Sequence, residues 1–600
     1  MNAATLQPMK PIATALLSLA LLTPASAQPP AAQSPAAPSV VAFVNVDVIR
    51  MDRERIERRH TVVVRRDRIA TVGAADDVAV PEGAMVIDGA GAFLMPGLID
   101  AHVHLPGTAF APSRPDFGDA PLYLAFGVTS VINLGGSPTD LDWRRRVAAG
   151  DLLGPTIYTS GPFVNEPRVN TVEDVQREVD AHVRGGYDLL KFREVMDPSG
   201  RVTATTRGLS LPVYRTLTGA ASTAGLPLVG HAPVNLGLDA MLEARQDLAH
   251  SGALSNIYFL PLASNVRLLA VTGAAWSALV AVAATWGVAA IIRRWRPSSA
   301  RQPPALSSIR RLTRWVLVAG LVAIVCAALV LPGGPLFEST ALRLLFTVIA
   351  WLVAVAAVLV MRHTIAAWGD AGSSRFVRLQ ASLVVVATLA LAAALTIFWA
   401  PIAWRSSDRG IDHVARRVRD SGISVQTTLI NYEFLSGPER LALIQEPAIA
   451  YLDEPVRTRW RRLPRTGSPG YAYHRFMKKL TGALHRAGVP LVAGTDAMGF
   501  PLIVPGASLH RELQLLTESG LTPYEAIRAA TVNPAAFLGK EDEFGTVAEG
   551  KRADLLLVAA DPLQDIARLK QPAGVMVRGR WMAHDTLQRH LAMLTEGQGR

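Results

Sequence analysis

The sequence predicts an α/β protein built on a (β/α)8 TIM barrel, with a composite β-sandwich and a four-helix transmembrane insertion. Eight short apolar runs, among them GLIDAHVHL and LVAGTD, have the pattern of strands, and most of them precede a helical pattern. Strand-like segments recur near both ends of the chain. Four long uncharged apolar runs, flanked by arginines, interrupt the second half of the barrel, which predicts helices that cross a membrane.

The N-terminal residues have the features of an export signal. Lys10 precedes a short apolar run, and the segment TPASA before Gln28 resembles a cleavage site. We therefore expect a signal peptide over residues 1–27, with an uncleaved anchor as the alternative. The Pro/Ala-rich residues 28–39 are expected to form a linker, because this composition has little to pack.

Two strand-rich flanks and a divided barrel follow. Residues 40–95 and 541–600 contain short alternating strands, and we expect them to form one composite β-sandwich. The barrel is expected over 96–262 and 406–540. Its sixth unit is interrupted after DLAHS, because the helix GIDHVARRVRDSG follows only after residues 263–405. This insert therefore leaves the barrel at the C-terminal face, where catalytic groups collect in this fold.

The insert contains four apolar spans, each long enough to cross a bilayer. Their expected bounds are 268–292, 315–337, 344–361 and 379–404. Several tryptophans lie near the span ends, as is typical of membrane interfaces. Buried core helices are the alternative interpretation.

The formal net charge of +11 belongs entirely to this insert. Residues 261–405 contain 13 arginines and 2 acidic residues, and the rest of the chain is neutral, which excludes a basic face for nucleic acid. The arginines concentrate in the first and third loops between spans, which the positive-inside rule places in the cytoplasm. We therefore expect a multi-pass protein of the bacterial inner membrane, with its barrel on the periplasmic, extracytoplasmic side.

The first barrel strand carries two candidate metal ligands. In DAHVH, Asp100, His102 and His104 lie on one face of the strand, because side chains alternate along it. Two imidazoles near a strand end can hold a zinc-like ion. An H-x-H pair also occurs by chance, but its place in MPGLIDAHVHLPG favours a metal site.

Four other strand ends carry polar side chains. His231 ends LPLVGH, His250 ends DLAH and Asp496 ends LVAGTD. One buried histidine is usually a core residue, but these strand ends meet at one mouth, and a buried carboxylate is costly without a cation. Lys191 in YDLLKF cannot bind a cation as an ammonium, whereas reaction with carbon dioxide would give a carbamate able to bridge two metals. A lysine that extends to solvent at the strand tip is the alternative.

With these motifs the chain resembles the amidohydrolase superfamily of metal-dependent hydrolases, in the branch of imidazolonepropionase-like proteins and Xaa-Pro dipeptidases. The motifs are PGLIDAHVHL, the lysine of strand four, GHAP, AHSG, GTDA and LTPYEAIRAATVNPAAFLG. The resemblance covers residues 40–260 and 409–582, and the insert departs from it. It implies one metal ion at His102, His104 and Asp496. It also implies a second ion at His231 and His250, with carboxylated Lys191 as the bridge.

The resemblance implies two divalent metal ions, expected to be Zn²⁺, that turn water into a hydroxide nucleophile. Asp496 would carry a proton to the leaving amine. The expected reaction is hydrolysis of an amide, peptide or cyclic amide bond in a small-molecule or peptide substrate. Because the enzyme is expected to lie at a membrane, this substrate could carry a lipid. A mononuclear deaminase-like or imidazolone-type hydrolase is one alternative, and a membrane sensor or transporter with a ligand-binding barrel is another. Tyr432 and Arg193 are candidates for substrate contact, with ordinary loop residues as the alternative.

Overall fold

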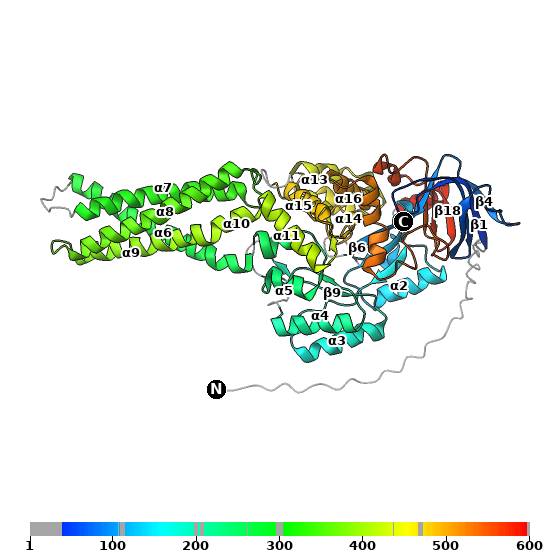
Figure 1. Cartoon of the computed structure of the whole chain (residues 1–600), viewed down its shortest axis with the longest axis horizontal. Helices are drawn as coiled ribbons and strands as arrows, with labels where there is room; N and C mark the ends of the chain where they lie inside the picture. The colour runs from blue at the N-terminus through cyan, green and yellow to red at the C-terminus, as the bar shows by residue number, and fades with distance from the viewer. Residues whose placement is uncertain are drawn as a thin grey trace, which may run out of the picture. The chain divides into compact units, whose positions relative to one another are not determined.

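The computed structural model describes residues 39–105, 107, 114–196, 202–203, 209–260, 262–295, 304–435, 437–465 and 472–596. The expected signal peptide lies outside the described residues, as does the expected linker apart from Ser39. Figure 1 shows the helices and strands of the described part.

Strands from both ends of the chain pair in one eight-stranded sheet with the order β18-β17-β16-β5-β1-β2-β3, and β4 pairs with β1. The strands are β1 (Val40–Val48), β2 (Glu57–Arg65), β3 (Arg68–Ala74), β4 (Met85–Asp88), β5 (Phe93–Pro96), β16 (Leu555–Val558), β17 (Gly574–Val577) and β18 (Arg580–Ala583). The antiparallel pair β5 and β16, with Leu555 opposite Pro96, joins the two flanks. Phe43 meets Trp581 edge to face at 5.2 Å between ring centroids. The two strand-rich flanks therefore share one sheet and one small core.

Eight parallel strands lie within the eight strand-like runs predicted from the sequence. They are β6 (Leu98–Val103), β7 (Val128–Asn133), β8 (Thr156–Thr159), β9 (Leu190–Phe192), β12 (Leu228–Gly230), β13 (Asp247–Leu248), β14 (Val425–Gln426) and β15 (Leu491–Val492). They form a three-stranded sheet, β6-β7-β8, and a five-stranded sheet, β15-β14-β13-β12-β9. Single bridges, Val103 to Ala497 and Ser160 to Leu189, link these sheets at both edges, so the ladder is not continuous around the ring. A short antiparallel pair, β10 (Val195–Met196) and β11 (Val202–Thr203), follows β9.

Helices alternate with these strands, as the sequence predicts. The longer ones are α2 (Pro138–Ala149), α3 (Val172–Gly185), α4 (Leu211–Thr223), α5 (Gly237–Ala244), α11 (Asp408–Ser421), α15 (Tyr473–Ala487) and α16 (Ala507–Glu518). The others are α1 (Ala120–Ala125), α12 (Leu429–Leu435), α13 (Gly437–Ile444), α14 (Glu454–Arg461), α17 (Pro523–Ala529), α18 (Val532–Phe537) and α19 (His584–Glu596). Local sequence sets the ends of α3, because Thr171 and Asp174 form a capping box and Gly186 ends the helix in a left-handed conformation. The last described element is the helix α19, which packs beside α1.

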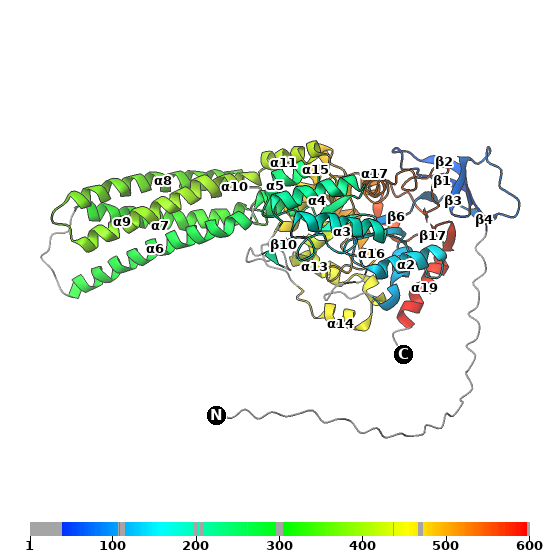
Figure 2. The same ribbon diagram turned by 90° about the horizontal axis from the view of Figure 1, so that it is seen from below.

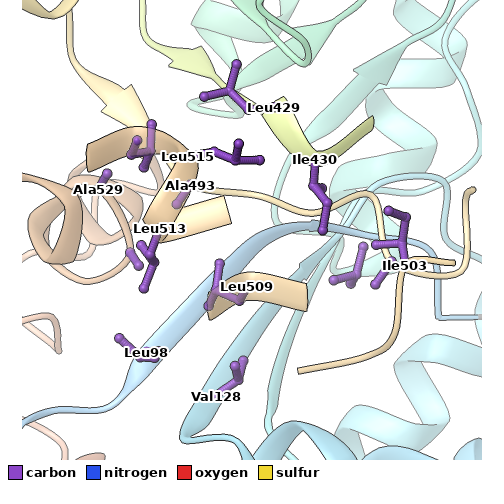
Figure 3. Close-up of a cluster of buried hydrophobic side chains, with 14 of the residues drawn as sticks. Leu98, Val128, Leu429, Ile430, Ala493, Ile503, Leu509, Leu513, Leu515 and Ala529 are labelled. Atoms are coloured by element: carbon purple, nitrogen blue, oxygen red, sulfur yellow. The ribbon is translucent and has the colours of Figure 1, made fainter. Parts of the chain in front are cut away.

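The barrel core lies between the strands and the surrounding helices. Leu509 and Leu513 of α16 point toward Leu98 of β6 and Val128 of β7, and all four are fully buried (Figure 3). At about 25 cal/mol per Å² of apolar surface removed from water, such side chains are the main stabilising contribution to the fold. This core holds the strand ends that carry the polar side chains described below.

The insert is a bundle of four long helices, which run side by side in Figures 1 and 2. They are α6 (Leu262–Trp295), α7 (Pro304–Val330), α8 (Thr340–Gly369) and α9 (Arg375–Ala393), and the last continues through Ala394–Trp399 into α10 (Ala400–Arg405). All four are long and apolar enough to cross a membrane, and they fit a transmembrane insert. The second helix ends at Val330, so the expected span over 315–337 is too long at its C-terminal end.

The loop between α7 and α8 contacts the barrel instead of continuing the span. Phe337 in this loop is 1% exposed, and its ring lies 5.6 Å from that of Phe476 in α15. Ala472 N–H donates to the carbonyl oxygen of Gly333 at 2.9 Å, and Arg475 donates to that of Pro335 at 2.9 Å. The barrel therefore contacts the insert at this loop as well as at the two points where the chain passes between them.

Arg343 organises the same junction from within α8. Its side chain is 1% exposed, and Nε donates to the carbonyl oxygen of Ala403 at 2.9 Å. One guanidinium nitrogen also donates to the carbonyl oxygens of Ser406, at 2.9 Å, and of Phe337. These acceptors include the last carbonyls of α10, where a cation interacts favourably with the helix dipole.

Candidate metal centre

Polar side chains from three strand ends form the centre of the site. One ligand atom of each of His102, His250 and Asp496 lies within 4.8 Å of those of the other two. The ring centroids of His102 and His250 are 4.6 Å apart, and Nε2 of His102 is 3.6 Å from Oδ1 of Asp496. Two imidazoles and a carboxylate at this spacing are suitable ligands for a divalent metal ion.

The other three predicted residues adjoin this group. Nε2 of His104 lies 2.9 Å from Oδ1 of Asp496. The His231 ring lies at right angles to that of His250, with 4.9 Å between centroids. Lys191 of β9 is 1% exposed and pairs in register with Val229 of β12, two residues before His231. The structure thus brings together all six residues that the sequence predicts for the site.

Hydrogen bonds to backbone carbonyl groups orient two of the imidazoles. Nδ1 of His102 donates to the carbonyl oxygen of Ala249 at 3.0 Å, and Nδ1 of His231 donates to that of Glu194 at 2.5 Å. Because a carbonyl only accepts, Nδ1 carries the proton in both rings and Nε2 keeps its lone pair. This arrangement is the one that metal-binding histidines adopt.

Nε2 of His102 and Nζ of Lys191 are among the buried polar atoms that have no hydrogen-bond partner in the described part of the chain. Leaving a buried polar atom unpaired costs about 1–3 kcal/mol. A metal ion would satisfy the lone pair of His102, and a carboxylated Lys191 would be an anionic ligand rather than an unpaired amine. The donor set therefore fits divalent metal ions.

Burial sets the protonation of these groups. It lowers the pKa of His250 to about 3 and that of His102 well below the ordinary value, with the charge of Lys191 adding to the effect. Both imidazoles are neutral at neutral pH, as metal binding requires. Burial also lowers the pKa of Lys191 to about 7, so a large fraction of this amine is neutral near that pH. Burial alone would raise the pKa of Asp496, but the neighbouring histidines hold it well below its usual value.

The backbone around Asp496 is unusual. Asp496 has a φ of 62°, and its N–H donates to the carbonyl oxygen of His102 at 2.7 Å. A Cβ atom at Gly494 would lie 2.6 Å from Cβ of His102. The glycine in GTD is therefore required by the close approach of β15 and β6. Strained backbone of this kind is often found at functional sites.

The sequence interpretation missed a turn after β14 that supports the site. Thr428 has a φ of 43°, rare for a β-branched residue, and its Oγ1 lies 2.9 Å from Nδ1 of His250. Asn431 donates from Nδ2 to Oδ2 of Asp496 at 3.0 Å. Glu512 of α16 accepts the backbone N–H groups of Leu429 and Ile430 at 2.9 and 2.8 Å. The only signal in the sequence is the asparagine that directly follows the apolar pair Leu429 and Ile430.

Three other residues were singled out in the sequence, and the structure gives each a different position. Asp100 accepts from Oγ1 of Thr495 at 2.6 Å and thereby fixes the end of β15. Tyr432 is buried, and its hydroxyl accepts the N–H of Gly252 at 2.7 Å. Arg193 is exposed and its guanidinium lies over the Phe163 ring, 5.1 Å from the centroid.

Sequence comparison finds a family match in the C-terminal part of the chain, which includes Asp496. Residues 472–582 match the amidohydrolase family. Ochratoxinase of Aspergillus niger is 37% identical over 101 residues, which are 16% of this chain and 20% of that protein. Imidazolonepropionase of Geobacillus kaustophilus is 36% identical over 98 residues, 15% of this chain and 21% of that protein. The matched segment spans about a fifth of the length of these curated relatives.

Structural comparison extends over most of the chain. Bottromycin amidohydrolase has a TM-score of 0.54 at 20% identity, covering 94% of this chain and 91% of that one. A Xaa-Pro dipeptidase with bound methionine has a TM-score of 0.51 at 15% identity, covering 91% of this chain and 100% of that one. At these identities the likeness shows the fold, which defines the class as a TIM-barrel-type α/β protein. Within that class this chain has an amidohydrolase family domain and four apolar helices that fit a transmembrane insert, which confirms the resemblance predicted from the motifs.

Proposed function

We propose that this protein is a membrane-tethered, binuclear metal-dependent amidohydrolase that cleaves an amide, peptide or cyclic amide bond. The observation that carries the proposal is the group of His102, His250 and Asp496, of which His102 and Asp496 are buried, and in which Nε2 of His102 has no hydrogen-bond partner in the described part of the chain. The family match and the named relatives support a hydrolase acting on carbon–nitrogen bonds.

In this proposal His102, His104 and Asp496 hold one divalent ion, expected to be Zn²⁺, and His231 and His250 hold the second. Bound there, the ions would lower the pKa of water and polarise the substrate carbonyl. Oδ1 of Asp496 lies 3.6 Å from Nε2 of His102 and 2.9 Å from Nε2 of His104, and Oδ2 accepts from Asn431. A carboxylate at the centre of the site can accept a proton and pass it to the leaving nitrogen.

Lys191 is proposed to join the two subsites as a carbamate. Only a neutral amine attacks carbon dioxide, and a pKa of about 7 leaves much of Lys191 neutral at physiological pH. In the reaction Nζ forms a bond to carbon and releases one proton, which gives an anionic group with two oxygens. This conversion removes the problem of an unpaired buried amine and supplies ligands for both ions.

The proposal treats the eight parallel strands as one (β/α)8 barrel over 96–262 and 406–540. The single bridges from Val103 to Ala497 and from Ser160 to Leu189 support this interpretation, because they lie at the two edges where the sheets would meet. The composite β domain comprises 40–95 and 541–600, and the insert comprises 263–405. In such a barrel the site lies at the C-terminal ends of the strands.

The decisive experiment combines metal analysis with a substrate screen on the full chain purified in detergent. We expect about two divalent ions per chain and hydrolysis of members of a panel of dipeptides and N-acyl amino acids. Lys191→Met is expected to lower the metal content toward one ion or none. An unchanged single ion in both proteins would favour a mononuclear deaminase-like site, and ligand binding without turnover would favour a sensor or transporter.

The membrane setting makes lipid-modified amides a substrate class to include. The panel should therefore contain acyl chains of increasing length on one amino acid. A rate that rises with chain length would support a membrane-associated substrate. Equal rates for short and long chains would remove that part of the proposal and leave the insert as an anchor.

We further propose that the barrel lies on the periplasmic, extracytoplasmic side of a bacterial inner membrane. The single native cysteine, Cys326, is buried in the bundle, so an introduced cysteine can be labelled selectively. We expect Glu82→Cys, on the exposed β domain, to react with a membrane-impermeant maleimide in intact spheroplasts. Arg314→Cys, near the start of the second span, is expected to react only after the membrane is opened. The reverse pattern would overturn the orientation.

A further inference from the structure

Asn431 is a buried amide in direct contact with the candidate site. It lies in the first turn of α12, just after β14, and is 4% exposed. Its Nδ2 is 3.0 Å from Oδ2 of Asp496. A carboxylate only accepts hydrogen bonds, so this contact fixes which end of the amide is which: Nδ2 bonds Asp496, and Oδ1 is the neighbouring acceptor.

The other end of the amide is unsatisfied. Oδ1 of Asn431 is buried and has no hydrogen-bond partner among the residues that the structure describes. Gln426 also has an unpaired buried oxygen, but its Nε2 donates to the backbone of Ala101 inside the barrel. Asn431 differs because its donor holds a residue of the site, which leaves an acceptor beside Asp496. A buried acceptor of this kind is unfavourable unless a ligand donates to it.

The turn that carries Asn431 is held firmly from behind. The side chains of Leu429 and Ile430 lie in the barrel core, where both are at most 2% exposed (Figure 3). Their N–H groups donate to the carboxylate of Glu512. Thr428 keeps its strained conformation next to His250. The amide is therefore preorganised, as functional groups that bind a ligand usually are.

We propose that Oδ1 of Asn431 accepts a hydrogen bond from the N–H of the scissile amide, so that the enzyme selects secondary over tertiary amides. This inference rests on the proposed function, in which Asp496 passes a proton to the leaving nitrogen. That nitrogen must then lie next to Asp496, on the side where Asn431 contacts it. A secondary amide supplies the missing donor, whereas an N-alkylated amide, including the imide bond before proline, has no hydrogen to donate.

The test is a matched pair of substrates that differ in one group. The best N-acyl amino acid of the panel is compared with its N-methyl derivative, in which a methyl group replaces the hydrogen on the scissile nitrogen. We expect wild-type kcat/KM to be roughly 10²-fold higher for the N–H substrate, because a site built to bond an N–H strongly disfavours an analogue without it. Equal values for the pair, or a preference for the N-methyl compound, would overturn the inference and leave the proposed function intact.

A variant separates substrate contact from simple support of Asp496. Asn431→Leu keeps the approximate shape and removes both polar atoms. We expect it to lose most of its rate on the N–H substrate and less on the N-methyl substrate, so that the ratio falls toward one. A merely structural role would lower both rates equally and leave the ratio unchanged, which would contradict the proposal. Metal content and melting temperature are measured alongside, and Asn170→Leu, at an exposed asparagine, is the matched control.

The experiment also distinguishes the two levels of the proposal. Hydrolysis of the N–H substrate with no discrimination against N-methylation refutes the role of Asn431 alone. A wild-type enzyme that binds its two ions and hydrolyses nothing in the panel refutes the proposed function and the inference together.

Discussion

The barrel mouth and the interior of the four-helix bundle both bury polar side chains, but they treat them differently. In the bundle, Oγ1 of Thr313 donates to the carbonyl oxygen of Ile309 at 2.8 Å, and Oγ1 of Thr388 donates to that of Val384 at 2.7 Å. The fully buried Arg343 has three backbone acceptors. Each of these polar groups is satisfied within the protein.

At the mouth, buried polar atoms are left unpaired. Nε2 of His102, Nζ of Lys191 and Oδ1 of Asn431 have no hydrogen-bond partner in the described part of the chain. A helix in hydrocarbon must satisfy its polar groups internally, because no water is available there. A binding site can keep its groups unpaired until a ligand arrives. The contrast therefore separates polar burial that stabilises the fold from polar burial that prepares a site.

The largest test of this contrast replaces a histidine of the mouth and, as a control, a buried histidine of α3 elsewhere in the barrel. We expect His102→Ala to lose bound metal and to lower kcat/KM by more than about 10³-fold, because the metal supplies the nucleophile. His182 is the matched control, since its two ring nitrogens lie 2.7 and 3.0 Å from the backbone oxygens of Glu178 and Pro162, so neither faces the site. His182→Ala is expected to lower the melting temperature and to leave the metal content per folded chain unchanged. Metal content retained in His102→Ala would break the comparison.

The next largest effect concerns Arg343, the buried and hydrogen-bonded arginine at the junction between the barrel and the insert. Arg343→Met is expected to lower the free energy of unfolding by about 3 kcal/mol, because it leaves buried carbonyl oxygens without a donor. The measurement is the melting temperature in detergent, with metal content as the second readout. Arg362→Met, at an exposed arginine of the same helix, is the control and should change little. Equal effects of the two substitutions would show that Arg343 does not stabilise the junction.

A pH series sharpens the comparison through Glu512, which holds the turn next to the site. Burial raises its pKa to about 7 from 4.5, so the folded state favours the protonated form more than the unfolded state does. Its contribution to stability is therefore complete below about pH 4.5 and is lost as the pH rises through about 7, by up to about 3 kcal/mol. Glu512→Gln does not titrate. The melting temperature of wild type minus that of Glu512→Gln should thus be greater at pH 5 than at pH 8, and a constant difference would refute this assignment.

The smallest expected effect concerns helix contact in the bundle. A Cβ atom at Gly320 of α7 would lie 2.3 Å from the Trp276 ring of α6, whereas one at Gly287 would meet nothing within 4 Å. Gly320→Ala is expected to destabilise the bundle by about 1–2 kcal/mol, because the helices must separate. Gly287→Ala should be neutral or slightly stabilising, because alanine favours helix. Thermal unfolding in detergent measures both, and a neutral Gly320→Ala would indicate that the two helices adjust freely.

Periodicity predicted the strands and the spans because each depends on a local pattern. The eight strand-like runs each contain one parallel strand, and GIDHVARRVRDSG is helix α11 after the insert. The second span was predicted to end at 337 but ends at Val330, because Phe337 is apolar for a different reason: it packs on Phe476 of the barrel. Hydropathy does not distinguish a side chain that faces lipid from one that faces protein.

The ligand candidates could be predicted because histidine and aspartate are uncommon at the ends of apolar strands, and because the strand ends of a barrel meet at one mouth. Thr428, Asn431 and Glu512 could not, because their importance depends on a strained turn and on contacts with α16 that are remote in sequence. Tyr432 was noted as a candidate for substrate contact, yet its hydroxyl supports the backbone of Gly252. The type of a residue indicates possible chemistry, whereas its role depends on the atoms it meets.

The docking of Phe337 on the barrel has a consequence for anyone who wishes to make a soluble form of the enzyme. Deleting the insert would remove Phe337 from Phe476, whose ring also packs edge to face with that of Phe259, with 5.0 Å between centroids. The truncated protein would then expose a hydrophobic surface on α15 at the former junction and would tend to aggregate. A usable deletion would need polar replacements at that surface, chosen so that α15 still supports the residues next to the site.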